Sequence, residues 1–379
     1  MVRLSSAGTT AIQAWNARAA SNRVALAAVH ANRDPWYKTP VRRNSALRVA
    51  IVGTALSASA CGASGGSSVE AGRDVASDVG AGAEDAAMEA SVGDVGGADS
   101  AAATDTDARG PRPTPTPACL ALVAGWNTGF VAGGLARSFY VDVPLDVATG
   151  GPWPVVFSWH GMNDPPEPMR DLLRAQLSGP SYRFILVTPD DLNLPLPLGA
   201  DWDNLELRDG SVEALLFDEI LTCLDARFGV DPDRVHSVGF SSGAIVSNML
   251  GVLRGDRIAS LTTFSGAYWS NAANGNALAF WPPLTTPNPY VQLMMYGGAS
   301  DSAFGVNFAL IAANDLPYLH AAGHDVIVCD HGGGHSLPTN FGGAQIAGFL
   351  RDHPRGIGTS PYAGGLPAGY PTLCVYRPR

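Results

Sequence analysis

The chain has 379 residues, of which 46% are hydrophobic and 15% charged, and its formal net charge is −10. This apolar content is enough for a sizeable core and excludes a wholly disordered chain. The excess of acidic residues disfavours nucleic acid as a partner, because phosphate binding needs a basic face. No apolar run reaches the ~18 residues that a membrane-spanning helix needs.

The first 60 residues are basic and end in a pattern typical of a bacterial export signal. Arg42, Arg43 and Arg48 precede a short apolar segment at 49–60, and Ala-Ser-Ala at 58–60 precedes Cys61. This predicts a signal peptide at 41–60. Small residues before a cysteine also resemble a lipobox, which implies a lipidated Cys61 on an exported lipoprotein, at the cell surface or in the periplasm. That lipid would be the only link to a membrane, and plain cleavage with secretion is the alternative.

Two further segments are expected to carry no fold. Residues 1–40 are too long to precede a signal peptide, so they are interpreted as a non-native extension ahead of an alternative start at Val41. Residues 61–117 are rich in Ala, Gly, Ser and Asp and then in Pro. They bury too little apolar surface to offset their ordering entropy, so a disordered acidic linker with a stiff Pro-rich end is predicted.

Residues 118–379 alternate strand-like and helical patterns. This alternation predicts an α/β domain with a mostly parallel sheet and helices on both faces. Strands are expected at 139–144, 154–159, 184–188, 235–240, 258–264, 290–296 and 326–329, and helices at 212–228, 244–253, near 304–322 and near 341–352.

The motif Gly239-Phe-Ser241-Ser-Gly243 lies between a predicted strand and a predicted helix. That context is typical of a nucleophile elbow, where glycines allow a tight turn that exposes the serine hydroxyl. A second match around Ser64 lies in the linker without a preceding strand and is interpreted as chance. Ser241 is therefore the candidate nucleophile.

A serine hydroxyl needs a base, and the base needs a carboxylate that holds its tautomer. On a sheet of this kind the chain order is Ser, acid, His. Asp301 follows a predicted strand and is the candidate acid, with Asp330 as the alternative. His335, in a Gly-rich loop after a later strand, is the candidate base, whereas His353 is expected on the surface.

Two backbone N–H groups are expected to bind the oxyanion, those of Ser242, after the nucleophile, and Met162, in the loop after the strand 154–159. His160 in that loop is expected to orient the loop. Asp330, His331 and His335 carry metal-ligand side chains, but the glycines between the histidines disfavour a helix and no further ligand cluster supports a site. No metal and no cofactor are therefore expected.

These positions together resemble the α/β-hydrolase fold, in particular the secreted esterases grouped with polyhydroxybutyrate depolymerases and feruloyl or acetylxylan esterases of carbohydrate esterase family 1. The resemblance covers about 137–350. It implies Ser241, Asp301 and His335 as the catalytic triad, and Met162 and Ala244 are departures from the family pattern. The segments that carry it are 137–144, 159–161, 231–235, 239–243, 264–266 and 333–338.

Four cysteines remain if Cys61 carries lipid, an even number in an exported protein. Two disulfides are expected, with Cys119–Cys223 and Cys329–Cys374 favoured among three connectivities. Free thiols are the alternative.

The predicted function is an exported serine esterase that acts through an acyl-enzyme on an ester substrate, which the resemblance allows to be polymeric. Feruloyl or acetyl esters of plant polysaccharide are favoured because Trp202 and Trp269 lie in long loops with polar amides, a composition suited to stacking on sugars or phenolic acyl groups. The alternative for the tryptophans is a role in closing the core. The alternatives for the function are a polyhydroxyalkanoate depolymerase-like esterase, a lipase or peptidase, or a non-catalytic surface-binding lipoprotein on a hydrolase scaffold.

Overall fold

The computed structural model describes residues 116–379, apart from 180–181, 197–198, 208–209, 276–280 and 286–287. The extension expected at 1–40, the signal peptide at 41–60, Cys61 with its lipid and nearly all of the linker at 61–117 lie outside the described residues.

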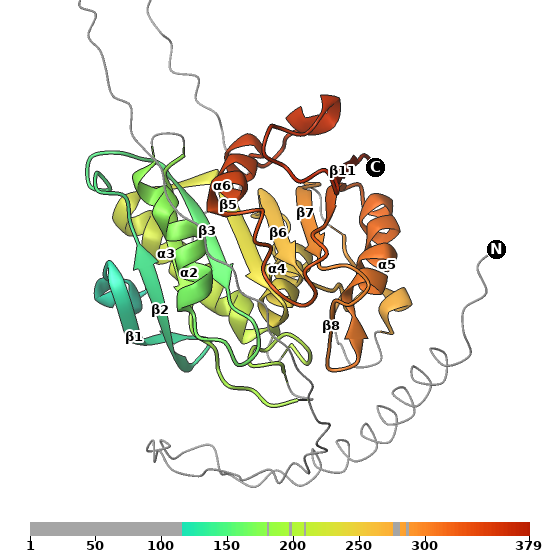
Figure 1. Cartoon of the computed structure of the whole chain (residues 1–379). Coiled ribbons are helices and arrows are strands. Elements are labelled where there is room, and N and C mark those ends of the chain that lie inside the picture. The colour runs from blue at the N-terminus through green and yellow to red at the C-terminus, as the bar shows by residue number, and fades with distance from the viewer. Residues whose placement is uncertain (1–115, 180–181, 197–198, 208–209, 276–280, 286–287) are drawn as a thin grey trace, which may run out of the picture. The chain divides into compact units, whose positions relative to one another are not determined.

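A nine-stranded sheet organises the described part of the chain (Figure 1). Its strands are β1 (Gly125–Ala132), β2 (Leu135–Asp142), β3 (Trp153–Trp159), β4 (Ile185–Pro189), β5 (Val230–Phe240), β6 (Ser260–Phe264), β7 (Val291–Tyr296), β10 (Asp325–Asp330) and β11 (Cys374–Arg377). They lie side by side in the order β1-β2-β4-β3-β5-β6-β7-β10-β11. The strands from β4 to β10 in this order run parallel, while β1, β2 and β11 pair antiparallel at the edges.

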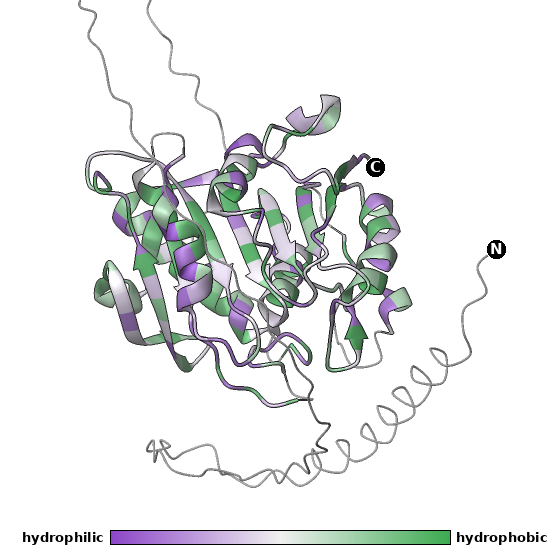
Figure 2. Cartoon of the chain, in the orientation of Figure 1, coloured by the Kyte–Doolittle hydropathy of each residue, from purple (hydrophilic) through white to green (hydrophobic). Residues whose placement is uncertain are grey.

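Helices cover both faces of the sheet, as the alternating sequence pattern predicted. They are α2 (Glu167–Arg174), α3 (Val212–Phe228), α4 (Ser242–Leu253), α5 (Phe308–Ala321) and α6 (Gly343–Asp352). The apolar residues of α3, α4 and α5 pack in one core cluster, and those of α2 and α6 pack in another. Because both faces are covered, central strands such as β6 are buried at every residue. Figure 2 shows hydrophobic colour on parts of the central strands, whereas β6, with its serine and two threonines, is largely pale although it is buried.

The predicted elements are all present, with shifted ends, and one needs correction. The helix expected near 304–322 begins only at Phe308, because β8 (Ser302–Ala303) and β9 (Val306–Asn307) form a small hairpin before it. The sequence reasoning did not identify β1, α2 or β11. His353, expected on the surface, is buried, and its Nδ1 and Nε2 lie 2.7 Å from Phe349 O and Ser360 Oγ.

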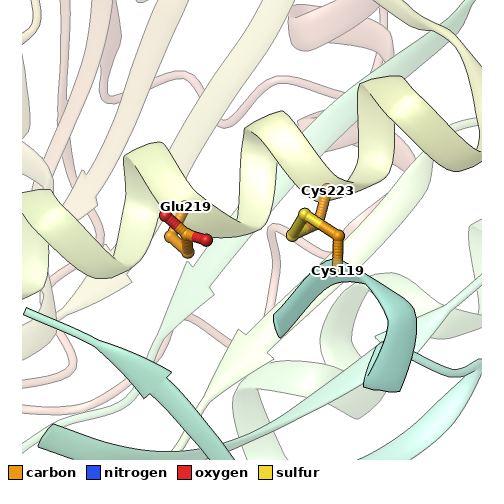
Figure 3. Close-up of side chains that lie close together, drawn as sticks. All are labelled: Cys119, Glu219 and Cys223. Carbon is orange, nitrogen blue, oxygen red and sulfur yellow. A yellow bond between two sulfur atoms is a disulfide. The ribbon is translucent and has the colours of Figure 1, made fainter. Parts of the chain in front are cut away.

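Two disulfides are present, and they are the favoured pairings. Cys119, in a short 3-10 helix (Pro117–Ala121), is bonded to Cys223 of α3. Figure 3 shows this bond with Glu219 one turn earlier on the same helix. Cys329 of β10 is bonded to Cys374 of β11 across the sheet edge. Each bond therefore ties a terminal part of the described chain to the sheet and its helices.

Within the described residues, we find no helix with the length and apolar character required to cross a bilayer.

Removing either disulfide should destabilise the fold, and more so for the longer loop. The sequence separations are 104 residues for Cys119–Cys223 and 45 for Cys329–Cys374. Loop-closure entropy then predicts a loss of about 2–4 kcal/mol for each paired Cys→Ala variant, with the larger loss for Cys119 and Cys223. Thermal unfolding with and without reductant measures this. A wild-type chain that loses no stability on reduction would contradict the prediction.

Candidate active site

Two glycines make the turn at the carboxyl end of β5 tight enough to present a serine. A Cβ atom on Gly239 would lie 2.2 Å from the carbonyl oxygen of Gly243, and a Cβ on Gly243 would lie 2.2 Å from that of Trp159. Any side chain at either position would therefore push α4 away from β5 or β3. This is the physical reason for the glycine at each end of the motif.

Ser241 itself adopts a strained backbone conformation at the top of this turn. Its φ is 52° and its ψ is −117°, a region that L residues rarely occupy. The peptide is held there by a hydrogen bond from Ser241 N–H to Phe264 O at 2.8 Å, and its carbonyl accepts the first bond of α4 from Ile245 N–H. The turn thus projects the hydroxyl away from the sheet.

The loops after β7 and β10 meet through their backbones. Gly334 N–H donates to Gly297 O at 2.8 Å, and a Cβ on Gly297 would lie 1.8 Å from Gly334 O. Gly334 also has a positive φ of 72°. The glycines therefore bring Asp301, at the end of one loop, beside His335 in the other.

The three predicted side chains form one hydrogen-bonded chain. His335 Nε2 lies 2.9 Å from Ser241 Oγ, and His335 Nδ1 lies 2.8 Å from Asp301 Oδ1. The tautomer that satisfies both contacts donates Nδ1–H to Asp301 and accepts the serine hydroxyl proton at Nε2. Asp330, the alternative acid, instead accepts from Gly332 N–H at 2.9 Å within its own loop.

Donors around Asp301 keep this buried carboxylate ionised. Burial opposes ionisation and is the largest single influence on its pKa. The hydrogen bonds from His335, from Gly297 N–H and from the Ser265 hydroxyl together outweigh it and hold the pKa below its usual value. Asp301 Oδ2 accepts from Gly297 N–H and from Ser265 Oγ, each at 2.8 Å. A permanent negative charge therefore faces the imidazole.

Two aromatic rings hold the His335 imidazole in place. Phe308, the first residue of α5, stacks on it at 4.8 Å between ring centroids and 18° between ring planes. Phe240, next to Ser241, lies 5.2 Å away. The sequence reasoning gave no role to Phe240, Phe308 or Ser265, although the motifs 239–243 and 264–266 contain the first and the last.

The segments that carry the two predicted oxyanion donors pack against each other. Ser242 N–H belongs to the first turn of α4, where N–H groups have no intrahelical acceptor. Met162 follows Gly161, whose Cβ position is 3.0 Å from the Phe240 ring, so this loop lies against the elbow. The Ser242 hydroxyl does not take part in the Ser241–His335–Asp301 hydrogen bonds. It donates to Ala200 O and accepts from Asn204 Nδ2 at 2.9 Å.

The tryptophans of the long loops lie in the core rather than at the surface. Trp202 is 0% exposed, donates its indole N–H to His160 O at 3.2 Å and stands edge-on to Trp159. Trp269 is 8% exposed. In this arrangement the ring of Trp202 offers no face to a ligand, and Trp269 is nearly as buried.

The loop that carries Trp269 is fastened to α5 by a buried carboxylate. Asp315 accepts from Tyr268 N–H at 3.0 Å and from the side-chain amides of Asn271 and Asn274 at 2.9 and 2.6 Å. Burial raises the pKa of Asp315 to about 7, even though these three donors oppose the shift.

Asp330, His331 and His335, the metal alternative raised by the sequence, do not form a ligand group. The described residues contain two groups of side chains close enough to share a metal ion, and neither includes these three residues.

Comparisons with known proteins show the fold. Neither the protein-family models nor the curated proteins contain a match. Among solved structures, native pOPH matches with a TM-score of 0.55 and 18% identity over 68% of this chain and 95% of its own. Native sOPH matches with a TM-score of 0.53 and 17% identity, over 68% of this chain and 95% of its own. A ferulic acid esterase matches with a TM-score of 0.39 and 16% identity, over 56% of this chain and 90% of its own. This likeness is weaker and says nothing about the substrate of the present chain.

The chain therefore has an α/β-hydrolase fold, the fold class that the sequence predicted. Its mostly parallel sheet, its helices on both faces and the strand-turn-helix at Ser241 are the features that define the class.

The buried carboxylate of Asp315 should make stability fall as pH rises from about 4 to 7. Its folded pKa, about 7, lies above the ordinary value of 3.8, so the folded chain binds more protons than the unfolded chain in that interval. Ionisation in the folded state then costs on the order of 4 kcal/mol above pH 7. Tm measured from pH 4 to 8 should fall less steeply in Asp315→Asn than in wild type. Asp256→Asn, at an exposed carboxylate, is the control, and equal slopes in all three proteins would contradict the assignment.

Proposed function

We propose that this protein is an exported serine esterase that cleaves carboxylic esters through an acyl-enzyme. The observation that carries the proposal is the hydrogen-bonded chain from Ser241 Oγ through His335 to buried Asp301. It supports Ser241 as the nucleophile, His335 as the base and Asp301 as the acid, and these residues follow the chain order Ser, acid, His that is typical of this fold. The strained backbone at Ser241 supports the same reaction class, as does the packing of the loop that carries Met162 against the elbow.

In the proposed reaction, Ser241 Oγ attacks the ester carbonyl carbon as its proton passes to His335 Nε2. Asp301 stabilises the imidazolium and holds its Nδ1–H. The N–H groups of Ser242 and Met162 donate to the oxyanion of the tetrahedral intermediate. Collapse breaks the bond to the alcohol, which takes the proton from His335. Water then repeats these steps on the acyl-enzyme and releases the acid.

Substitutions at neighbouring positions separate the catalytic side chains from their surroundings. Ser241→Ala should lower kcat/KM by at least about 10⁴-fold with folding intact, and His335→Ala by a similar factor, because triad members act as a unit. Ser242→Ala should keep most activity, since its proposed role uses the backbone, but should be less stable because its buried hydroxyl bonds are lost. Asp301→Asn should lose far more activity than Asp330→Asn.

Hydrolysis of p-nitrophenyl acetate and labelling by a fluorophosphonate measure these effects. A folded wild-type chain that neither turns over esters nor labels at Ser241 would support the alternative of a non-catalytic binding protein. Equal activity losses in Asp301→Asn and Asp330→Asn would remove the acid assignment.

For the substrate we propose short or aromatic acyl esters attached to carbohydrate. The small exposed part of Trp269 in the loop after β6 supports this class, while the burial of Trp202 supports a purely structural role for that ring. The export signal and lipid anchor belong to the same proposal. They would place such an esterase outside the cytoplasm, where polymeric substrates lie.

A matched pair of tryptophan variants tests this substrate class. Trp269→Phe should lower kcat/KM for feruloyl or acetyl-sugar esters more than for p-nitrophenyl acetate, because only the larger esters reach the loop. Trp202→Phe, the control at a fully buried ring, should affect all three esters alike. Uniform losses in Trp269→Phe, or a preference for long-chain triglycerides, would overturn the carbohydrate-ester proposal.

A further inference from the structure

A second cluster of chemically active side chains lies at the carboxyl edge of the sheet. His160 directly follows β3, and Asp190 and Asp191 directly follow β4, its parallel neighbour. One ligand atom from each of the three side chains lies within 4.8 Å of the other two. None of these side chains belongs to the Ser241, His335 and Asp301 chain.

The ring of His160 aims an unpartnered nitrogen into this cluster. The residue is 1% exposed, and its Nδ1–H donates to Gly161 O at 2.9 Å. In that tautomer Nε2 carries a lone pair, and it has no hydrogen-bond partner in the structure. Its polar neighbour is Asp191 Oδ2 at 3.8 Å, another acceptor. A buried lone pair that faces a carboxylate oxygen is unfavourable unless a proton or a cation lies between them.

The charges around the cluster favour a cation. Apart from His160, no cationic side chain in the described part of the chain forms an ion pair with Asp190 or Asp191.

The guanidinium of Arg137, which contacts this segment, is already matched by a carboxylate. Arg137 donates to the carbonyl oxygen of Asp190 at 3.3 Å but pairs with Glu213 at 2.7 Å. Among the described residues, the carboxylates at 190 and 191 therefore have no guanidinium partner that could take the place of an incoming ion.

We propose that His160, Asp190 and Asp191 bind a divalent transition-metal ion, with Zn²⁺ as the best match. An imidazole with two carboxylates suits Zn²⁺, whereas Ca²⁺ and Mg²⁺ prefer oxygen ligands alone. Ligands about 2.0–2.2 Å from Zn²⁺ lie roughly 3.5 Å apart in a tetrahedral site. The His160–Asp191 pair at 3.8 Å is close to that spacing, and the remaining pairs lie within 4.8 Å, so binding would close none of them by more than about 1.3 Å. The Nδ1–H bond to a backbone carbonyl is also the usual support for a metal-bound histidine.

The consequence for catalysis rests on the proposed function. Gly161 O and Met162 N–H belong to one peptide unit, so the bond from His160 Nδ1–H to Gly161 O fixes the direction of the Met162 N–H. A metal on Nε2 would lock His160 in this tautomer. His160 is thus a positioning residue for one of the two proposed oxyanion donors.

The other group with metal-ligand spacing is not expected to bind Zn²⁺. It consists of Cys119, Glu219 and Cys223 (Figure 3), and its sulfur atoms are joined in a disulfide rather than free as thiolates.

Metal binding is testable without any activity measurement. The full-length protein, produced without a polyhistidine tag, is stripped with EDTA, and Zn²⁺ is titrated by calorimetry with bound metal counted by mass spectrometry. We expect one Zn²⁺ per chain, and a Tm that rises by several degrees at about 100 times Kd. Asp190→Asn, Asp191→Asn and His160→Gln should each bind at least about ten-fold more weakly.

His320→Gln, which changes a histidine on α5 outside the cluster, is the matched control and should bind Zn²⁺ like wild type. Should His160→Gln fail to fold, the near-isosteric Asp191→Asn decides. Zn²⁺ uptake equal in wild type and Asp191→Asn, or no uptake in wild type, would overturn the site and leave a proton shared by His160 and Asp191. Ser241→Ala should bind Zn²⁺ normally, which separates failure of this inference from failure of the proposed esterase function.

Discussion

The geometry of the site depends on backbone segments that approach too closely for any side chain. Cβ atoms on Gly239, Gly243 and Gly297 would lie 2.2, 2.2 and 1.8 Å from carbonyl oxygens of neighbouring segments. The first two contacts press the start of α4 against β5 and the end of β3. The third presses the loop after β7 against the loop after β10. Four connections at one edge of the sheet are thereby packed backbone to backbone, and Ser241, His335 and Asp301 in three of them fall within hydrogen-bond distance.

Close packing also sets the electrostatics. Because Asp301 is buried, its charge is stabilised only where donors replace the lost water, and Gly297 N–H, Ser265 and His335 supply them. Gly297 therefore has two functions, each served by a different contact. Its missing side chain permits the approach of Gly334, and its N–H stabilises the carboxylate. A larger residue at this position would disturb the position and the charge of the acid together.

The sequence predicted what depends on local pattern and chain order. Alternating strands and helices gave the parallel sheet, and the motif around Ser241 with the order of Asp301 and His335 gave the residues that the fold brings together. The sequence did not identify what depends on distant packing. Edge strands such as β1 and β11 are short or half-exposed and lack a clear buried pattern. The contact of Phe308 with His335 joins residues that share no motif, and Trp202 occurs in a polar loop yet is buried, since Trp159 and His160 O supply its partners.

The two proposed oxyanion donors differ in how rigidly they are held. Ser242 N–H belongs to a helix whose start is fixed by Gly239 and Gly243, so nothing short of moving α4 redirects it. Met162 N–H belongs to a loop peptide, and its direction depends on the hydrogen bond that His160 makes to Gly161 O. The tautomer of His160 depends in turn on what faces its Nε2, where Asp191 lies 3.8 Å away. In the proposed mechanism, the proton or cation between His160 and Asp191 therefore controls the direction of the Met162 N–H, which the rest of the fold does not fix.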